Sequence, residues 1–337
     1  MDQFTRREAL QAGLALAGSA LAPSVFAQDS DKPLRAGIIG LDTSHVVAFT
    51  NAFNNPNAKP ELAGVKVVAA YPAGSPDIPA SKDRIEGFTK TLRDKHMVEI
   101  VESIDALLGK VDVVLLESVD GRPHLEQARP VFKAKKPVFI DKPVAGSLAD
   151  AIQIYALAAE TGTPCFSSSS LRFAPGVQAI RNDPKVGEIL GCDSYGPAPT
   201  EPHHPDLFWY GIHGVEILFA IMGAGCESVT RTMTKDTDKV VGVWPNGRLG
   251  SFRGIRAGKA DYGATVFGKA GVAPAGGSGG YEPLLVEIAK FFKTGKAPVS
   301  PEETINMFAF MEAADESKRQ NGAPVTIASV MAKAKKS

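Results

Sequence analysis

Short apolar runs alternate with helical patterns through the first half of the chain. The runs are rich in β-branched residues and fall at 36–39, 65–70, 111–116 and 137–140. Helical patterns separate them, at 44–54, 84–94, 103–108 and 125–134. Strands that alternate with helices predict an α/β fold with a parallel sheet covered on both faces. Ligands bind such sheets beyond the carboxyl ends of the strands, so the candidate site segments are 40–45, 71–75, 117–122 and 141–143.

The second half of the chain has a different pattern. Strand-like runs fall at 240–247, 249–253 and 264–267, with a turn signal at Asn246-Gly247. The glycine-rich stretch 271–280 predicts a flexible loop. We therefore expect a parallel-sheet domain over residues 33–147 and a second α/β domain over 148–337.

The segment after the first strand looks like a dinucleotide-binding turn of the Rossmann type with two glycines replaced. Gly40 takes the first glycine of G-x-G-x-x-G, and Asp42 and His45 take the second and third. Thr43 and Ser44 complete the turn. A carboxylate at Asp42 would repel a diphosphate unless it turned away to cap the following helix.

Other strand ends supply further candidates for cofactor contact. After the second strand the chain has three prolines and no acidic or basic residue placed to select a ribose, so Ser75 or Tyr71 is the candidate there, with a plain surface loop as the alternative. Asp141-Lys142-Pro143 ends a buried strand and places an amine at the sheet edge. The remaining candidates are Glu117, Ser118 and His124.

The first residues have the features of an export signal. Arg6 and Arg7 form a twin-arginine pattern, a weakly apolar run follows at 12–22, and 25–27 resembles a signal-peptidase site. The apolar run is too short for a membrane span of roughly 20 residues. We predict a twin-arginine signal peptide over residues 1–27 and an exported, periplasmic mature chain without a membrane span; an amphipathic N-terminus is the alternative.

Charge and cysteine content exclude some classes of partner. The 337 residues carry 37 Lys+Arg and 37 Asp+Glu with no basic patch, which argues against nucleic acid or a membrane surface. Cys165, Cys192 and Cys226 are widely spaced and give no metal-binding pair, so buried free thiols are favoured over one disulfide.

These motifs resemble the glucose–fructose oxidoreductase / inositol dehydrogenase (Gfo/Idh/MocA) family, in order and spacing, over nearly all of the mature chain. Members carry Glu-Lys-Pro where this chain has Asp141-Lys142-Pro143. The other similar segments are 123–125, 135–138, 170–175, 208–216, 285–295 and 301–317.

The resemblance implies a Rossmann domain followed by a domain with an open, mainly antiparallel sheet. It also implies hydride transfer between NAD or NADP and a secondary alcohol of a sugar or cyclitol. Lys142 would lie near the reacting hydroxyl and His213 would exchange its proton. The residues that we expect at the substrate are Arg172, His203, His204, Trp209 and Tyr210. A dimer or tetramer follows from the resemblance alone. Because free nicotinamide cofactor is not expected outside the cytoplasm, an exported member would have to hold its dinucleotide tightly.

One departure from the family leaves alternatives open. Many members have an Asp four residues before the catalytic histidine, and here that position is Trp209. A non-redox, metal-assisted sugar hydrolase or lyase and a catalytically silent sugar-binding protein are therefore alternatives to the oxidoreductase. The segment 201–206 holds two histidines and two acids, but its spacing matches no known ligand set, so we predict no metal site there.

Overall fold

The N-terminal part of the chain forms the predicted parallel sheet. The computed structural model describes residues 32–277 and 279–336, so the predicted signal peptide lies outside the described residues. The first sheet has six strands in the order β3-β2-β1-β4-β5-β6, all parallel. Its strands are β1 (Leu34–Ile39), β2 (Val65–Tyr71), β3 (Glu99–Ile100), β4 (Val113–Leu116), β5 (Val138–Ile140) and β6 (Cys165–Ser167). The strand order reverses between β1 and β4, which is the ligand-binding position of a Rossmann fold.

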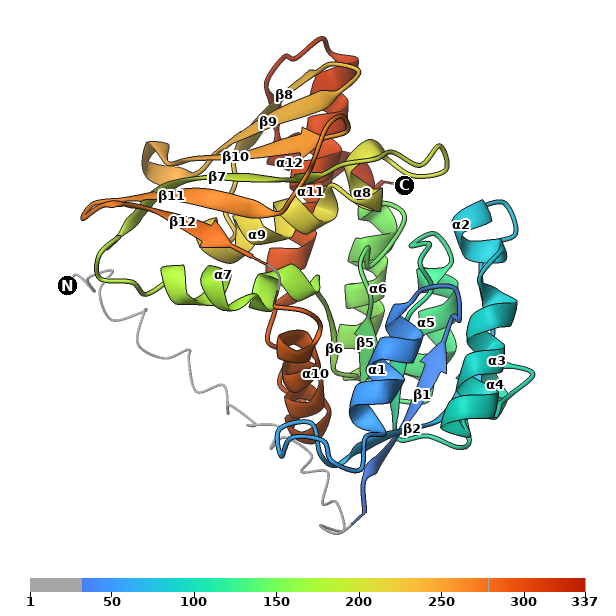
Figure 1. The fold of residues 1–337 in the computed structure, drawn as a ribbon. Coiled ribbons are helices and arrows are strands. Elements are labelled where there is room, and N and C mark those ends of the chain that lie inside the picture. Colours follow the sequence, from blue (N-terminus) through green and yellow to red (C-terminus); the bar gives the residue numbers. More distant parts are fainter. Residues whose placement is uncertain (1–31, 278, 337) are drawn as a thin grey trace, which may run out of the picture. The chain divides into compact units, whose positions relative to one another are not determined.

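Helices cover both faces of this sheet, as predicted (Figure 1). They are α1 (His45–Phe53), α2 (Pro79–Lys82), α3 (Ile85–His96), α4 (Ile104–Leu108), α5 (His124–Lys133) and α6 (Leu148–Thr161). Phe49 of α1 and Leu92 of α3 share one buried cluster with α10 (Glu282–Thr294), which returns from the far end of the chain. The opposite face packs on α4, α5 and α6. The last quarter of the chain therefore completes the core of the first sheet.

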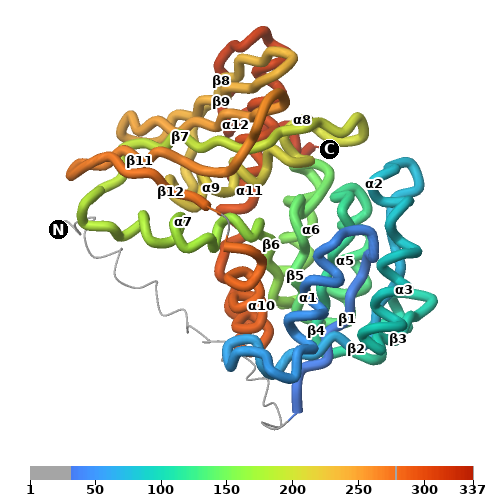
Figure 2. Tube along the Cα trace, viewed as in Figure 1, coloured from blue at the N-terminus to red at the C-terminus, as the bar shows by residue number. Residues whose placement is uncertain are grey.

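The second sheet has seven strands in the order β12-β11-β7-β10-β9-β8-β13. Every neighbouring pair is antiparallel except β10 with β7, so the mainly antiparallel sheet is confirmed. Its strands are β7 (Ile189–Pro197), β8 (Ser228–Met233), β9 (Thr237–Val243), β10 (Leu249–Ile255), β11 (Gly263–Gly268), β12 (Val272–Gly276) and β13 (Val325–Thr326). Figure 2 follows the chain from the first sheet into this one.

The helices around the second sheet position the site. They are α7 (Pro175–Ile180), α8 (Asp206–Trp209), α9 (Ile212–Met222), α11 (Pro301–Arg319) and α12 (Ile327–Ala334), with 3-10 turns at Ser170–Phe173 and Pro245–Gly247. Helix α9 is apolar on all sides and buried along nearly its whole length, as expected of a helix in the middle of a core. It carries His213 in its first turn, so that histidine is held rigidly.

Three expectations from the sequence need correction. The stretch 271–280 is not all loop, because Val272–Gly276 pairs with β11 as an edge strand. The strand predicted to reach residue 247 ends at Val243, because Asn246 and Gly247 adopt positive φ in the turn to β10. The first sheet also continues past residue 147, where we placed a domain boundary, since β6 pairs with β5.

The three cysteines are free and buried, as predicted. Within the described part of the chain, no helix is long and apolar enough to cross a membrane.

Candidate active site

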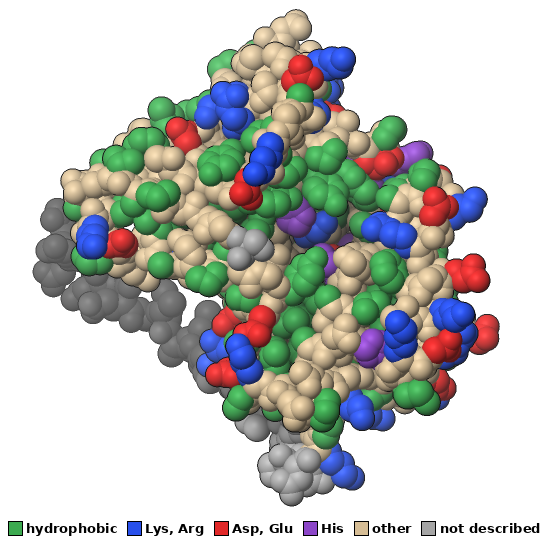
Figure 3. Space-filling model, in the orientation of Figure 1, with side chains coloured by type: hydrophobic (Ala, Val, Ile, Leu, Met, Phe, Trp, Pro, Cys, Tyr) green, Lys and Arg blue, Asp and Glu red, His purple; other side chains and the backbone are tan. Residues whose placement is uncertain are grey.

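A cavity of about 600 Å³ opens at the carboxyl ends of the parallel strands. Residues of the β1–α1 turn and of the β5 end line it, together with residues of α8, of α9 and of the segment before β11. In the space-filling view histidine side chains, in purple, are visible in the hollow between the two parts of the molecule (Figure 3). The lining residues are Thr43, Ser44, His45, Ala80, Arg84, Val119, Asp141, Lys142, Ser170, Leu171, Trp209, Tyr210, His213, Tyr262, Gly280 and Tyr281.

Lys142 and His213 meet at this cavity from different parts of the fold. Lys142 follows β5 and is buried, with its Nζ 5.5 Å from the centre of the Tyr210 ring. His213 Nδ1 lies 2.7 Å from Ser169 Oγ. Burial and the nearby Lys142 charge lower the pKa of His213 well below its usual value. Burial also lowers the pKa of Lys142, against the opposing charges of Asp141 and Glu117. The imidazole is therefore neutral near neutral pH and free to accept a proton.

A second group of titratable side chains lies beside Lys142. His45 Nδ1 is 2.8 Å from Asp141 Oδ2 and 3.8 Å from Glu117 Oε2. Glu117 is fully buried, and neither of its carboxyl oxygens has a hydrogen-bond partner among the described residues. Burial and the charge of Asp141 raise the pKa of Glu117 well above its usual value. His45, which follows β1, thus contacts residues that follow both β4 and β5.

The first turn keeps the backbone of a dinucleotide-binding turn. Gly40 has φ +90°, and a Cβ there would lie 2.4 Å from Ser118 N, so only glycine is accommodated. Asp42 does not cap α1. Its Oδ1 accepts from Val119 N at 2.9 Å and its Oδ2 accepts from Ser81 Oγ at 2.6 Å. Because the carboxylate is buried and bonded elsewhere, it does not face the cavity as a free charge.

Residues 75–82, which we call the cover segment, lie over this turn. Ser75 N donates to Ser81 Oγ at 2.7 Å, and the Ser75 hydroxyl donates to Asp120. Since Ser81 also bonds Asp42, the cover segment joins the β1 turn to the loop after β4. The Ser75 hydroxyl that we expected to contact a ribose is thus committed to Asp120.

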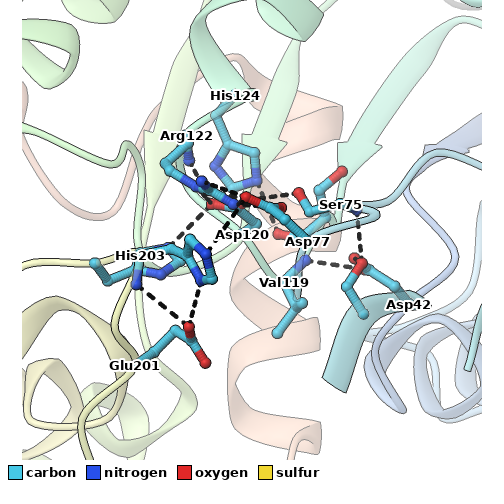
Figure 4. A network of polar contacts seen from close by, with 12 residues as sticks. Asp42, Ser75, Asp77, Val119, Asp120, Arg122, His124, Glu201 and His203 are labelled. Carbon is cyan, nitrogen blue, oxygen red and sulfur yellow. Dashed lines mark hydrogen bonds and ion pairs between the residues drawn. The ribbon is translucent and has the colours of Figure 1, made fainter. Parts of the chain in front are cut away.

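A polar network ties the cover segment to the second domain (Figure 4). Asp120 bonds Arg122, and its Oδ1 lies 3.0 Å from His204 Nε2. Arg122 also pairs with Asp77, and His203 lies between Asp77 and Glu201. Although burial raises it, hydrogen bonds from His204, Arg122 and Ser75 hold the pKa of Asp120 far below its usual value. His203 and His204 therefore serve a bridge between loops, and neither lines the cavity.

Several other predicted site residues also lie outside the cavity lining. Ser118 Oγ donates to Gln127, and the ring nitrogens of His124 lie 2.8 and 3.3 Å from the carbonyls of Ser118 and Val144. Arg172 forms buried ion pairs with Glu216 and Glu303 in place of a substrate contact. Pro143 follows a cis peptide bond. Trp209 and Tyr210 line the cavity.

Sequence reasoning missed Arg84, Ser169, Tyr262 and Tyr281. They come from the start of α3, the run after β6, the approach to β11 and the start of α10. A serine run at 167–170 gave a weak signal for Ser169. The others reach the site only through tertiary packing, for which one sequence carries no signal.

Residues 34–169 match the family model described as "Oxidoreductase family, NAD-binding Rossmann fold", GFO_IDH_MocA. The match covers the part of the chain that forms the first sheet. No curated protein sequence matches the chain.

Several solved structures are similar to this chain over almost their whole length. A probable dehydrogenase from Thermotoga maritima is 21% identical with a TM-score of 0.71, covering 88% of this chain and 100% of that one. A putative myo-inositol dehydrogenase from Sinorhizobium meliloti is 17% identical with a TM-score of 0.69, covering 87% and 99%. A scyllo-inositol dehydrogenase from Lactobacillus casei, with bound NAD(H) and scyllo-inositol, is 14% identical with a TM-score of 0.70, covering 88% and 100%. At these identities the likeness shows the fold.

The β1–α1 turn suits the phosphates of a dinucleotide. Thr43 and Ser44 line the cavity at the N-terminus of α1, and within the described residues their backbone N–H groups have no acceptor. Such N–H groups bind phosphate. Asp42 no longer opposes this, because its charge is bonded to Ser81 and Val119. Ala80 of the cover segment lines the same cavity, so a dinucleotide at this turn would lie beside that segment.

Proposed function

We propose that this protein oxidises a secondary alcohol of a sugar or cyclitol with a tightly held nicotinamide dinucleotide. The observation that carries the proposal is the meeting of Lys142 and His213 at one cavity beyond the carboxyl ends of the parallel strands. An amine and a neutral imidazole at one hydroxyl are the groups that alcohol oxidation needs.

The side chains divide the chemistry between them. A bound nicotinamide supplies the acceptor for the hydride. His213 removes the hydroxyl proton at Nε2, which requires that Nδ1–H donate to Ser169 Oγ. Lys142 stabilises the negative charge that develops on the substrate oxygen. Trp209 offers a ring face to a polyol, and Tyr210 and Tyr262 offer ring faces and hydroxyl groups.

The cover segment supports tight retention of the cofactor. The Ser81–Asp42 and Ser75–Asp120 bonds hold this segment beside the turn where a dinucleotide would bind, which would slow the release of the cofactor. Slow exchange suits an enzyme that leaves the cytoplasm with its cofactor in place. We propose export through the twin-arginine pathway on the pattern at Arg6 and Arg7.

The test starts from the purified protein. Small molecules released on denaturation are identified by mass spectrometry, and a panel of cyclitols and sugars is then added with NAD or NADP while nicotinamide reduction is followed by absorbance. We expect bound dinucleotide and reduction with at least one polyol. A protein that neither contains nor binds a dinucleotide and reduces none would overturn the proposal.

A second candidate function is favoured by one observation. The buried group His45–Glu117–Asp141 is a possible metal-ligand set beside Lys142 and His213. A metal-assisted, non-redox reaction on the same polyol would use the same proton-transfer pair. In that case the substrate panel yields products with no change in nicotinamide absorbance.

A further inference from the structure

Three potential ligand atoms gather at the carboxyl ends of three adjacent strands. His45 opens α1 after β1, Glu117 follows β4 and Asp141 follows β5, and β1, β4 and β5 are neighbours in the sheet. One ligand atom from each residue lies within 4.8 Å of the other two. We propose that His45, Glu117 and Asp141 bind a divalent transition-metal ion, whether or not the protein uses a dinucleotide.

The Glu117 carboxylate points to a missing partner. It is fully buried, and neither oxygen has a hydrogen-bond partner among the described residues. Burying a charged or polar group without a partner is costly, so such groups are normally paired or bound to metal. The other buried carboxylates nearby are satisfied: Asp42 by Ser81 and Val119, and Asp120 by Arg122 and Ser75.

The three side chains also have the right chemistry for a cation. Glu117 and Asp141 are buried acids within a few ångströms of the His45 imidazole. Carboxylate oxygens and an imidazole nitrogen are ligands that divalent transition-metal ions accept in proteins.

The distances suit coordination after a small adjustment. Metal–ligand bonds of about 2.0–2.2 Å in a tetrahedral site separate ligand atoms by roughly 3.3 Å. His45 Nδ1 is 2.8 Å from the Asp141 oxygen and 3.8 Å from the Glu117 oxygen, so the two spacings straddle that value. Side-chain rotations that move these ligand atoms by a few tenths of an ångström would bring both spacings to that value.

The ligand set indicates the metal and its open position. One imidazole with two carboxylates suits Zn²⁺, Mn²⁺ or Fe²⁺ better than Mg²⁺, which binds nitrogen poorly. Three protein ligands leave a coordination position open. His45 and Asp141 line the cavity with Lys142 and His213, so that position faces the substrate space. A polyol hydroxyl bound there would be acidified next to the base.

Two departures from the family motifs converge on this cluster. His45 stands at the third glycine of the dinucleotide-binding turn, and Asp141 stands for the Glu of Glu-Lys-Pro. The structure places both changes against Glu117, from a third segment of the chain. If His45 and Asp141 had replaced the family's residues independently and without effect on function, there would be no reason for both to lie beside Glu117.

The test compares metal binding by wild type and Glu117→Gln, with no substrate present. After removal of bound metal by a chelator, Zn²⁺ and Mn²⁺ are titrated by calorimetry and thermal unfolding is followed at each addition. We expect wild type to bind one ion and its Tm to rise by roughly 5 °C at saturating metal. Glu117→Gln should weaken binding by about 100-fold or more, while its metal-free form unfolds at no lower a temperature than metal-free wild type.

His203→Gln is the matched control, because it changes the other histidine that lies between carboxylates, Asp77 and Glu201. It should bind Zn²⁺ and Mn²⁺ as wild type does. Absence of binding in wild type would overturn the proposal, and so would wild-type affinity in Glu117→Gln. Either failure leaves the oxidoreductase proposal standing, because that one is judged by nicotinamide reduction.

Discussion

At the residue scale, His213 and Lys142 are proposed to act on the same substrate hydroxyl. His213 removes its proton, and Lys142 stabilises the negative charge that develops on its oxygen. His213→Gln keeps a side chain of similar size but removes the base, and Lys142→Met keeps the stem but removes the charge. Each should lower turnover of the polyol by about 10²-fold or more, with circular dichroism and Tm unchanged. His96→Gln, at the C-terminal end of α3 and outside the cavity lining, is the control for histidine loss. Full activity in either variant would remove that residue from the mechanism.

The lowered pKa of His213 makes a prediction about pH. A base must be deprotonated to act, so the acid limb of kcat/KM falls at the pKa of the free enzyme's base. Burial and Lys142 lower that pKa, so the limb should lie well below the ordinary histidine value of about 6.5. A pH–rate profile with polyol as the varied substrate measures it. An acid limb at or above the ordinary value would show that another group, or a solvated His213, is the base.

At the element scale, the cover segment makes the site depend on loops that the sequence shows only as proline-rich. Ser81→Ala removes the donor to Asp42 and the acceptor for Ser75 N. We expect a loss of about 1–2 kcal/mol in unfolding free energy and faster exchange of bound dinucleotide, measured by displacement with labelled NAD. Ser103→Ala, which removes the N-cap of α4, costs about as much and should leave the exchange rate unchanged. Equal exchange rates in the two variants would contradict the role of the cover segment.

The Asp120 network gives the loops a pH-dependent stability. The folded pKa of Asp120 is depressed by its partners, so its contribution is present above the unfolded value of about 3.9 and is lost as pH falls through the folded value. Asp120→Asn should cost about 3 kcal/mol at pH 7. The difference from wild type in urea unfolding should shrink as the pH falls below about 4. A difference that is constant with pH would show that the charge of Asp120 does not stabilise the fold.

The local sequence pattern was sufficient to predict the strands and helices, but not the contacts within the candidate site. The strands before Gly40 and Lys142 and the helix bearing His213 were predictable, because apolar periodicity and strand-ending motifs are encoded locally. The bonds of Asp42 to Ser81 and Val119 were not, because they join residues far apart in the chain. The same holds for Arg172, whose charge looked available for substrate until packing placed it against Glu216. The meeting of His45, Glu117 and Asp141 is likewise a product of the strand order.

At the scale of the whole molecule, we propose that copies of the chain associate through the second sheet. Leu249, Phe267 and Val272 are exposed. Their register places them in one row across β10, β7, β11 and β12, with Gly191 between Leu249 and Phe267. Such an apolar row suits a second copy of the same sheet.

Light scattering after size exclusion tests this association. The double variant Leu249→Arg, Phe267→Arg should be monomeric where wild type is a dimer or larger. Met97→Arg, at a separate exposed position after α3, should associate as wild type does. A wild type that is monomeric at all concentrations would refute the association.

The proposed export is tested on the whole precursor. Changing Arg6 and Arg7 to Lys should retain the precursor inside the cell, because the translocase reads paired guanidinium groups and Lys supplies only the charge. Fractionation of cells followed by immunoblotting measures this. Normal export of the variant would show that the leader works by another route.

We propose that hydride leaves a carbinol carbon of a sugar or cyclitol in the cavity shared by Lys142 and His213. The most direct test uses a polyol deuterated at the carbinol carbons, incubated with the cofactor-loaded protein, with the dinucleotide then recovered for mass spectrometry. The account predicts that the reduced dinucleotide carries deuterium with wild type and not with His213→Gln. Conversion of the polyol with no deuterium in the dinucleotide would contradict the claim and indicate non-redox chemistry at the same cavity.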